Sequence, residues 1–180
     1  MRRRDSAYTK LVIRSLAMRR PLAIDSIPKG LIDFAKRNKV LYLLGLYDER
    51  VSRMSVWLKL KKRLKEQRRA ILEAVNVANS IGVEVMIVKT LKPFQYAPDD
   101  VDLLVLDEGG FREFINALLE RGYLIRKRGT PEITLRRIVD GIYVDLDIHT
   151  KMGAGPYEYI DKFYLWERMD FRDLGGTLVL

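Results

Sequence analysis

Two acidic segments of this sequence contain the strongest candidates for metal binding and catalysis. In the first, Asp100 and Asp102 alternate with apolar residues, so at the two-residue period of a strand both carboxylates project from one face. Paired carboxylates repel each other, and a divalent cation removes the repulsion because Mg²⁺ and Mn²⁺ prefer hard oxygen ligands. The alternative is a strand end with solvated acids, or a turn built on Pro98 and Asp99.

The second acidic segment covers residues 143–149. Its apolar residues alternate with Asp145, Asp147 and His149, which therefore share the opposite face. If the two segments are neighbouring strands, their carboxylates meet, and such a set can hold two metal ions for phosphoryl chemistry. The histidine is either a structural hydrogen-bonding group or a member of the site, and the sequence leaves both open.

The composition limits which other chemistry is available. The 180 residues, 48% of them hydrophobic, suffice for one large domain or for a core with an appendage. The absence of Cys excludes disulfides, thiolate zinc sites and cysteine nucleophiles, and a single His excludes a histidine-rich metal site. A bound metal ion would therefore be held mainly by carboxylates. No run of eighteen apolar residues and no secretory leader is present, so we expect a cytoplasmic protein with no membrane partner.

The charge is strongly basic, with 33 Lys and Arg against 24 Asp and Glu and a formal net charge of +9. Such a field attracts nucleotides and nucleic acids. The most basic stretch, residues 59–69, lies in a segment with helical apolar spacing, and it is either a solvated helix face or a polynucleotide groove. High charge of both signs with few Asn, Gln and Cys also fits a thermophilic source, in which case the surplus need not mean binding.

Periodicity predicts an N-terminal helical region over residues 1–81. Its first twenty residues have the spacing of a short basic amphipathic helix that Pro21 ends. A second helix is predicted over 27–37 with Asp25-Ser26 as its cap, and a third over 40–47. Residues 48–80 contain no Pro or Gly and predict one long helix, broken at most once.

The hydrophobic period then changes from 3.6 to 2, which predicts an α+β core over residues 82–180. Strands are expected over 83–88, 101–105 and 123–128, with a helix over 111–121. Asp140-Gly141 predicts a two-residue hairpin turn between strands 132–139 and 142–149. A connecting loop over 152–156, a helix over 157–168 and a turn at Gly175-Gly176 are expected to follow. The final residues read as part of a strand, so the polypeptide is expected to continue beyond Leu180.

This order of elements resembles the nucleotidyltransferase superfamily of DNA polymerase beta. It is most similar to a branch catalogued as uncharacterised nucleotidyltransferases, whose pattern is an apolar strand ending Lys-Gly, then Asp-x-Asp-Leu-Leu-Val, a Gly-Tyr after the next helix, and Asp-x-His. The matching stretches here are Val85-Met86-Ile87-Val88-Lys89-Thr90, Asp100-Val101-Asp102-Leu103-Leu104-Val105, Arg121-Gly122-Tyr123 and Asp147-Ile148-His149. The similarity covers roughly residues 30–180 and implies a nucleotidyltransferase-like mixed β-sheet flanked by helices.

The resemblance also implies a site. Asp100 and Asp102 match the first two metal-binding carboxylates of the family, and Asp147 matches the third, which would also help to deprotonate the acceptor hydroxyl. Asp145, one pleat away on the same face, is the alternative third ligand. His149 matches the histidine of the branch.

Lys89 and Thr90 match the turn that holds the nucleotide phosphates in the family. The activity implied is transfer of a nucleoside monophosphate from a nucleoside triphosphate, ATP first among them, to a hydroxyl group, with Mg²⁺ or Mn²⁺ as cofactor. The sequence does not identify the acceptor, for which RNA and a protein are the candidates.

Two departures from the family pattern favour alternatives to catalysis. Thr90 stands where glycine lets the backbone approach a phosphate closely, and residues 96–99 lack the arginine that usually precedes Asp-x-Asp. One alternative is a weak or inactive module with this fold that binds RNA or a protein partner. Another is one half of a toxin and antitoxin pair. The sequence does not fix the base preference or the oligomeric state.

Overall fold

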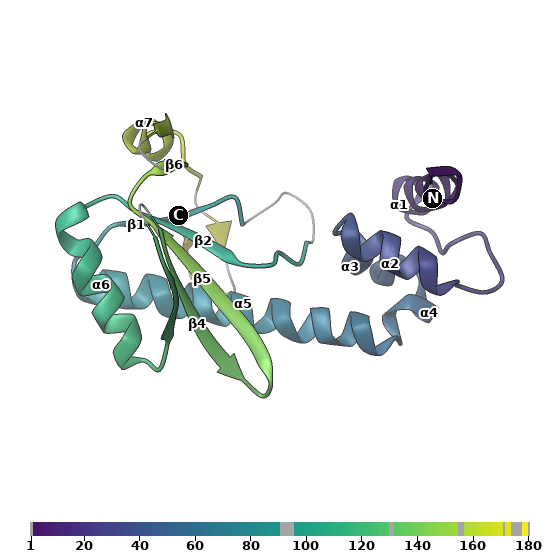
Figure 1. Ribbon diagram of the computed structural model, residues 1–180, viewed down its shortest axis with the longest axis horizontal. Helices are drawn as coiled ribbons and strands as arrows, with labels where there is room; N and C mark the ends of the chain where they lie inside the picture. Colours follow the sequence, from purple (N-terminus) through teal and green to yellow (C-terminus); the bar gives the residue numbers. More distant parts are fainter. Residues whose placement is uncertain are drawn as a thin grey trace. The chain divides into compact units, whose positions relative to one another are not determined.

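The computed structural model of the chain describes residues 2–90, 96–129, 132–154, 157–170, 172–173 and 178–179 (Figure 1). The chain divides into two compact units, which we call the helical unit (residues 1–64 and 92–98) and the sheet unit (residues 65–91 and 99–180). The division falls inside the longest helix and not at its end near residue 81, because the second half of that helix packs into the core of the sheet unit.

The helical unit follows the predicted order of helices. Its elements are α1 (Arg2–Met18), α2 (Lys29–Arg37), α3 (Leu41–Tyr47), α4 (Glu49–Ser52) and the first part of α5 (Ser55–Ser80). The single break expected in the long helix lies at residues 53–54, between α4 and α5. The predicted Asp25-Ser26 cap is wrong, because Pro28 occupies the cap position of α2 and no side chain caps the helix.

The core of the helical unit is built around Trp57. Its indole ring stacks on Tyr42 with 5.4 Å between ring centroids, and its Nε1 donates a hydrogen bond of 3.0 Å to the Tyr42 carbonyl. Gly45, one turn further along α3, leaves the space that the indole fills, because a Cβ there would lie 2.0 Å from Trp57 Nε1. The contact fixes the start of α5 against α3.

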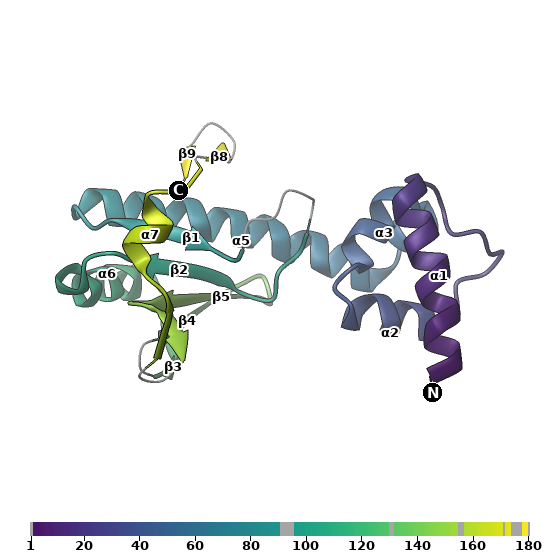
Figure 2. The same cartoon turned by 90° about the horizontal axis from the view of Figure 1, so that it is seen from above.

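The sheet unit contains a mixed five-stranded sheet. Its elements are β1 (Val85–Val88), β2 (Val101–Val105), α6 (Glu108–Glu120), β3 (Leu124–Arg128), β4 (Glu132–Val139) and β5 (Ile142–His149). The strand order is β1-β2-β5-β4-β3, and β2 and β5 are its parallel pair (Figure 2). The predicted mixed α+β class, with a mixed sheet flanked by helices, is thereby confirmed.

The two faces of this sheet differ because apolar and polar residues alternate along its strands. One face is buried under α5 and α6 (Figure 1). This core includes Ile71, Ala74 and Ala78 of α5, Phe114 and Leu118 of α6, and Leu103, Leu135, Leu146 and Ile148 of the sheet. The opposite face bears the acidic residues, and α7 (Lys162–Trp166) packs on its β1 and β2 side against the cluster that contains Val88 and Leu104 (Figure 2).

The hairpin of β4 and β5 has the predicted boundaries and turn. Asp140 and Gly141 both have positive φ, 49° and 73°, as a two-residue turn matched to the twist of the strands requires. The turn fixes the register, which pairs Arg136 with Asp145 and Thr134 with Asp147. Every acid on the open face of β5 therefore has a defined neighbour on β4.

Other predicted boundaries are wrong. Helix α6 begins at Glu108, before the expected residue 111, because the Asp107 side chain accepts hydrogen bonds from the backbone N–H groups of Gly109 and Gly110. The expected loop at 152–156 is in part strand β6 (Met152–Ala154), which pairs with β7 (Tyr157–Ile160) where a helix was predicted.

Short strands β8 (Arg172–Asp173) and β9 (Leu178–Val179) pair at the end of the chain, and the predicted Gly175-Gly176 turn lies outside the described residues. Among the helices that the structure describes, none combines the length and the apolar character needed to cross a lipid bilayer.

Candidate active site

The register of the parallel strands brings the two acidic segments together. Asp102 of β2 is the direct partner of Asp147 of β5, and Val88 of β1 pairs with Asp102 on its other side. Neighbouring strands lie about 4.8 Å apart, so two side chains in register on one face are within reach of a shared ligand. Asp100 directly precedes β2. Acids far apart in the sequence thus meet on the open face of the sheet.

Asp102 is held by two side-chain partners, a lysine and a histidine. Its Oδ1 accepts a hydrogen bond of 2.8 Å from Lys89 Nζ and lies 3.2 Å from His149 Nε2. Burial alone would raise the pKa of Asp102, but the bonds from His149 and Lys89 outweigh it and hold that pKa below its usual value. His149, 8% exposed, is thus a partner of the site that keeps this carboxylate ionised and oriented.

Asp147 has the opposite environment. Its Oδ1 is buried and has no hydrogen-bond partner among the residues that the structure describes. Burial raises the pKa of Asp147, a hydrogen bond from Thr134 partly opposes it, and the negative charges of Asp100, Glu132 and Asp102 raise it further. Repulsion between these carboxylates therefore acts mainly on Asp147, whose ionised form it destabilises.

Glu132 is a member of this cluster that sequence reasoning missed. It pairs with His149 in the hairpin register and forms an ion pair of 3.1 Å with Lys127. The signal that could have identified it was available, because a two-residue turn at 140–141 fixes which residue of β4 faces each residue of β5.

Asp145 is engaged by two arginines. Its Oδ1 accepts from Arg136 Nε, and its Oδ2 accepts from an Arg136 terminal nitrogen and from Arg126, each at 2.7 Å. Arg136 also lies over the ring of Tyr143 at 4.8 Å. Because both oxygens of Asp145 are bonded to guanidinium groups and the residue is 9% exposed, this geometry argues against Asp145 as the alternative metal ligand. The two arginines are partners that the sequence pattern did not reveal.

The turn after β1 carries Lys89 and Thr90, beside Asp102. Lys89 adopts a positive φ of 58°, a conformation that costs a non-glycine residue free energy. Thr90 is 6% exposed, and its Oγ1 accepts a hydrogen bond of 2.8 Å from the backbone N–H of Asp102. The threonine hydroxyl therefore holds the start of β2, while the lysine ammonium group is the polar group that the turn presents to the acids.

The donor chemistry of the pair fits a hard divalent cation. Within the described part of the chain, no group of three or more His, Cys, Asp or Glu side chains is arranged as a metal site. Asp102 and Asp147 nevertheless offer adjacent carboxylate oxygens, and the unpaired buried Oδ1 of Asp147 is an atom that a cation would satisfy. The Lys89 ammonium group is bonded to Oδ1 of Asp102, so a metal ion bound to that same oxygen would compete with it.

Comparison of the sequence with protein-family models and with curated proteins finds no match. The resemblance to nucleotidyltransferases therefore stays a prediction.

Proposed function

We propose that the protein is a nucleotidyltransferase that moves a nucleoside monophosphate from a nucleoside triphosphate, ATP in the first instance, to a hydroxyl group. The observation that supports this most is the register pairing of Asp102 with Asp147, whose buried Oδ1 has no hydrogen-bond partner among the residues with described positions. Ordinary packing gains nothing from two facing acids, whereas cation-assisted phosphoryl transfer requires them.

The metal ion would be held by Asp102 and Asp147, with Asp100 as the third carboxylate. When bound, a divalent cation neutralises charge on the triphosphate and lowers the pKa of the acceptor hydroxyl. Asp147 would accept the proton of that hydroxyl through a carboxylate oxygen that the cation does not occupy. Lys89 leaves Asp102 and donates hydrogen bonds to the β and γ phosphates, and His149 keeps Asp102 oriented.

The transfer needs no reactant other than the nucleoside triphosphate and the acceptor hydroxyl. The acceptor oxygen forms a bond to the α phosphorus and loses its proton to Asp147. The bond between the α phosphorus and the oxygen bridging to the β phosphate breaks, and pyrophosphate leaves with that electron pair.

Isothermal titration calorimetry with ATP tests this proposal. We expect wild-type protein to bind ATP in the presence of Mg²⁺ and at least tenfold more weakly in its absence. Asp102→Asn and Asp147→Asn should each lower the affinity about tenfold or more, since each removes one charged metal ligand. The matched control is Asp140→Asn, which changes the same charge in the exposed hairpin turn, where Asn tolerates the positive φ of 49°. Equal affinities for wild type and both site variants would refute the proposal.

A second candidate is a module that binds without catalysing transfer. The observations that favour it are the ion pair between Lys89 and Asp102 and the commitment of the Thr90 hydroxyl to β2, which leaves the turn without a glycine for close phosphate approach. In that case the ion pair is permanent, so Lys89→Ala would lower the melting temperature while Mg²⁺ and ATP together would not raise that of the wild type.

A further inference from the structure

The surplus positive charge of this protein belongs to one of its two units. The helical unit has 18 Lys and Arg against 5 Asp and Glu, a net charge of +13. The sheet unit has 15 against 19, a net charge of −4. Positive charge that served only solubility would have no reason to be concentrated in one unit. The helical unit is therefore the part of the protein that would bind an anionic partner.

A cavity in the helical unit collects part of this charge. It has a volume of about 340 Å³ and lies between α1 and the segment that follows it. Lys10, Arg14 and Arg20 line it, and no acidic side chain does. All three are exposed, and within the described part of the chain none of them forms an ion pair. Met18, Pro21 and Ala23 give the same cavity an apolar wall.

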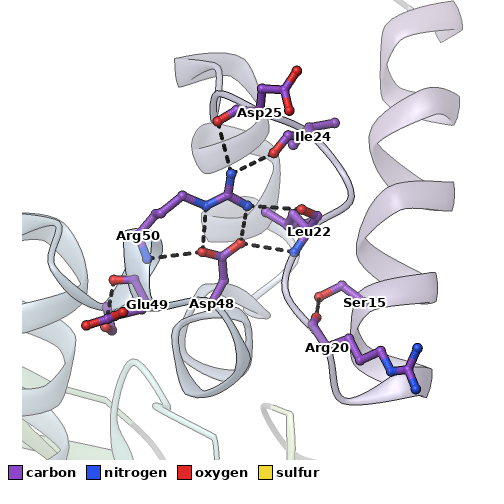
Figure 3. A network of polar contacts seen from close by, with 9 residues as sticks. Ser15, Arg20, Leu22, Ile24, Asp25, Asp48, Glu49 and Arg50 are labelled. Atoms are coloured by element: carbon purple, nitrogen blue, oxygen red, sulfur yellow. Dashed lines mark hydrogen bonds and ion pairs between the residues drawn. The ribbon is translucent and has the colours of Figure 1, made fainter.

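The wall of this cavity is fixed by a partly buried polar network (Figure 3). Ser15 of α1, 4% exposed, donates a hydrogen bond of 2.5 Å to the Arg20 carbonyl, which ties the returning chain to the helix. The fully buried Asp48 carboxylate accepts from the backbone N–H of Leu22 at 3.0 Å. Arg50 donates to carbonyl oxygens of the same segment, those of Leu22 at 3.0 Å, Ile24 at 2.6 Å and Asp25 at 3.1 Å.

Asp48 and Arg50 are also bonded to each other, at 2.7 and 3.0 Å (Figure 3). The Arg50 guanidinium group holds the pKa of Asp48 below its usual value, so the network stays ionised at neutral pH. Segment 20–25 is therefore held in place, and the cavity exists before any ligand arrives. Preorganisation of this kind lowers the entropic cost of binding.

From this combination we infer that the cavity between α1 and segment 20–25 binds the phosphate backbone of a nucleic acid, with a nucleoside against its apolar wall. The three exposed cations that line the cavity select an anion, and the apolar wall suits a base or sugar edge better than a bare phosphate. The volume suits a group the size of one nucleotide and is too small for the face of a protein helix. The charge continues well beyond the cavity, which favours a polymer over a small phosphate ester.

This inference does not depend on nucleotidyl transfer in the sheet unit. Asp147→Asn, which removes a residue of the proposed active site, should bind nucleic acid as the wild type does. The two proposals can therefore fail separately.

Fluorescence anisotropy with a fluorescein-labelled 20-nucleotide single-stranded RNA tests the inference over a range of salt concentrations. The variant Lys10→Gln, Arg14→Gln, Arg20→Gln should bind about tenfold or more weakly, and its salt slope should fall by about 2, as expected for three lost contacts to a single strand. The matched control Lys29→Gln, Lys36→Gln, Lys59→Gln removes the same charge at exposed positions of the helical unit outside the cavity and should change affinity less than threefold. Ala23→Glu, which adds an acid to the wall, should weaken binding with all cations retained.

Circular dichroism establishes whether each variant is folded. If the triple variant does not fold, the affinity of Ala23→Glu for RNA still tests the inference. Equal weakening by the cavity variant and the control would overturn the inference, as would the absence of RNA binding by the wild type. Competition by AMP or by polyglutamate as effective as competition by unlabelled RNA would also overturn it, since the occupant would then be a small phosphate ester or an acidic peptide.

Discussion

Asp102 and Asp147 are chemically identical and face each other across two strands, but the protein treats their charges in opposite ways. Asp102 has bonds to Lys89 and His149 that favour its ionised form. Asp147 has a buried oxygen for which the described part of the chain supplies no hydrogen-bond partner, and three neighbouring negative charges that disfavour its ionisation. Selection for stability alone would not keep a carboxylate in the surroundings of Asp147. The free energy cost of that carboxylate therefore points to a function.

The same substitution should therefore have opposite effects at the two positions. Asp147→Asn removes a charge held at a cost, and we expect it to raise the free energy of unfolding at pH 7 by about 0.5–2 kcal/mol. Asp102→Asn leaves Lys89 and His149 without their acceptor charge, and we expect a loss of about 1–2 kcal/mol, modest because the Lys89 side chain is half exposed. Urea denaturation measures both. Destabilisation by both variants would contradict the account of Asp147.

The raised pKa of Asp147 gives the first of these effects a pH dependence. A group whose pKa is higher in the folded state than in the unfolded state destabilises the protein once it is ionised. The free energy cost of the ionised Asp147 carboxylate is absent when the pH is well below 3.8, the ordinary pKa of an aspartate. The cost grows as the pH rises from there through the folded-state pKa, and it is constant at higher pH. The stability gain of Asp147→Asn should accordingly be largest at neutral pH and vanish in acid. Denaturation curves between about pH 3 and pH 7 give the difference directly, and a gain that grows towards low pH would have the wrong sign.

The strained turn at Lys89 offers a test of its own. Lys89→Gly and Lys89→Ala both remove the ammonium group, but glycine adopts a φ of 58° at little cost whereas alanine does not. We expect the glycine variant to be more stable than the alanine variant by about 1 kcal/mol. Both should bind ATP equally weakly, because the lost charge and not the backbone determines affinity. Thermal unfolding and calorimetry separate the two effects.

At the scale of elements, the sequence predicts those parts of the fold that local residues determine. The hairpin of β4 and β5 has its predicted boundaries because Asp140-Gly141 specifies both turn and register. The acids of β2 and β5 lie on one face as predicted. Side chains alternate between the two faces of a strand, and the apolar residues of these strands occupy the buried face. That they lie on adjacent strands could not be derived from local residues, since strand order is decided by packing across the whole sheet.

The wrong predictions concern segments whose conformation depends on residues that are remote in the sequence. Residues 157–160 carry a helix-compatible pattern but form β7, because pairing with β6 decides the conformation of so short a segment. Asp25 and Ser26 read as a cap but belong to a segment held by Arg50, which is remote in sequence. The arginines that engage Asp145 come from β3 and β4, so the local pattern of β5 could not show that this carboxylate is paired.

Gly45 provides a prediction at this scale. Replacing a helix-interior glycine with alanine usually stabilises a helix by about 0.5–1 kcal/mol. Here we expect Gly45→Ala to cost about 2–3 kcal/mol, because the new methyl group would overlap the buried Trp57 ring, which its hydrogen bond to Tyr42 holds in place. Gly30→Ala in α2 is the control, since the nearest atom there is the hydroxyl of Tyr8, at the end of a movable side chain. Equal effects of the two changes in thermal unfolding would contradict the proposed packing.

At the scale of the whole molecule, the chain combines a basic helical unit with an acidic sheet unit. The net charge of +9 thus conceals +13 in one unit and −4 in the other. The division assigns the two proposed activities to different parts of one chain. The helical unit attracts a polyanion, and the sheet unit concentrates carboxylates where a cation and a triphosphate would meet.

The most direct test of the central claim is a crystal structure of the wild-type protein with Mn²⁺ and a non-hydrolysable ATP analogue. The anomalous signal of manganese identifies the ion without relying on its ligands. We expect a manganese peak bonded to both Asp102 and Asp147, with Lys89 moved from Asp102 to a phosphate of the analogue. A structure in which the analogue and manganese lie elsewhere, and Lys89 still bonds Asp102, would contradict it.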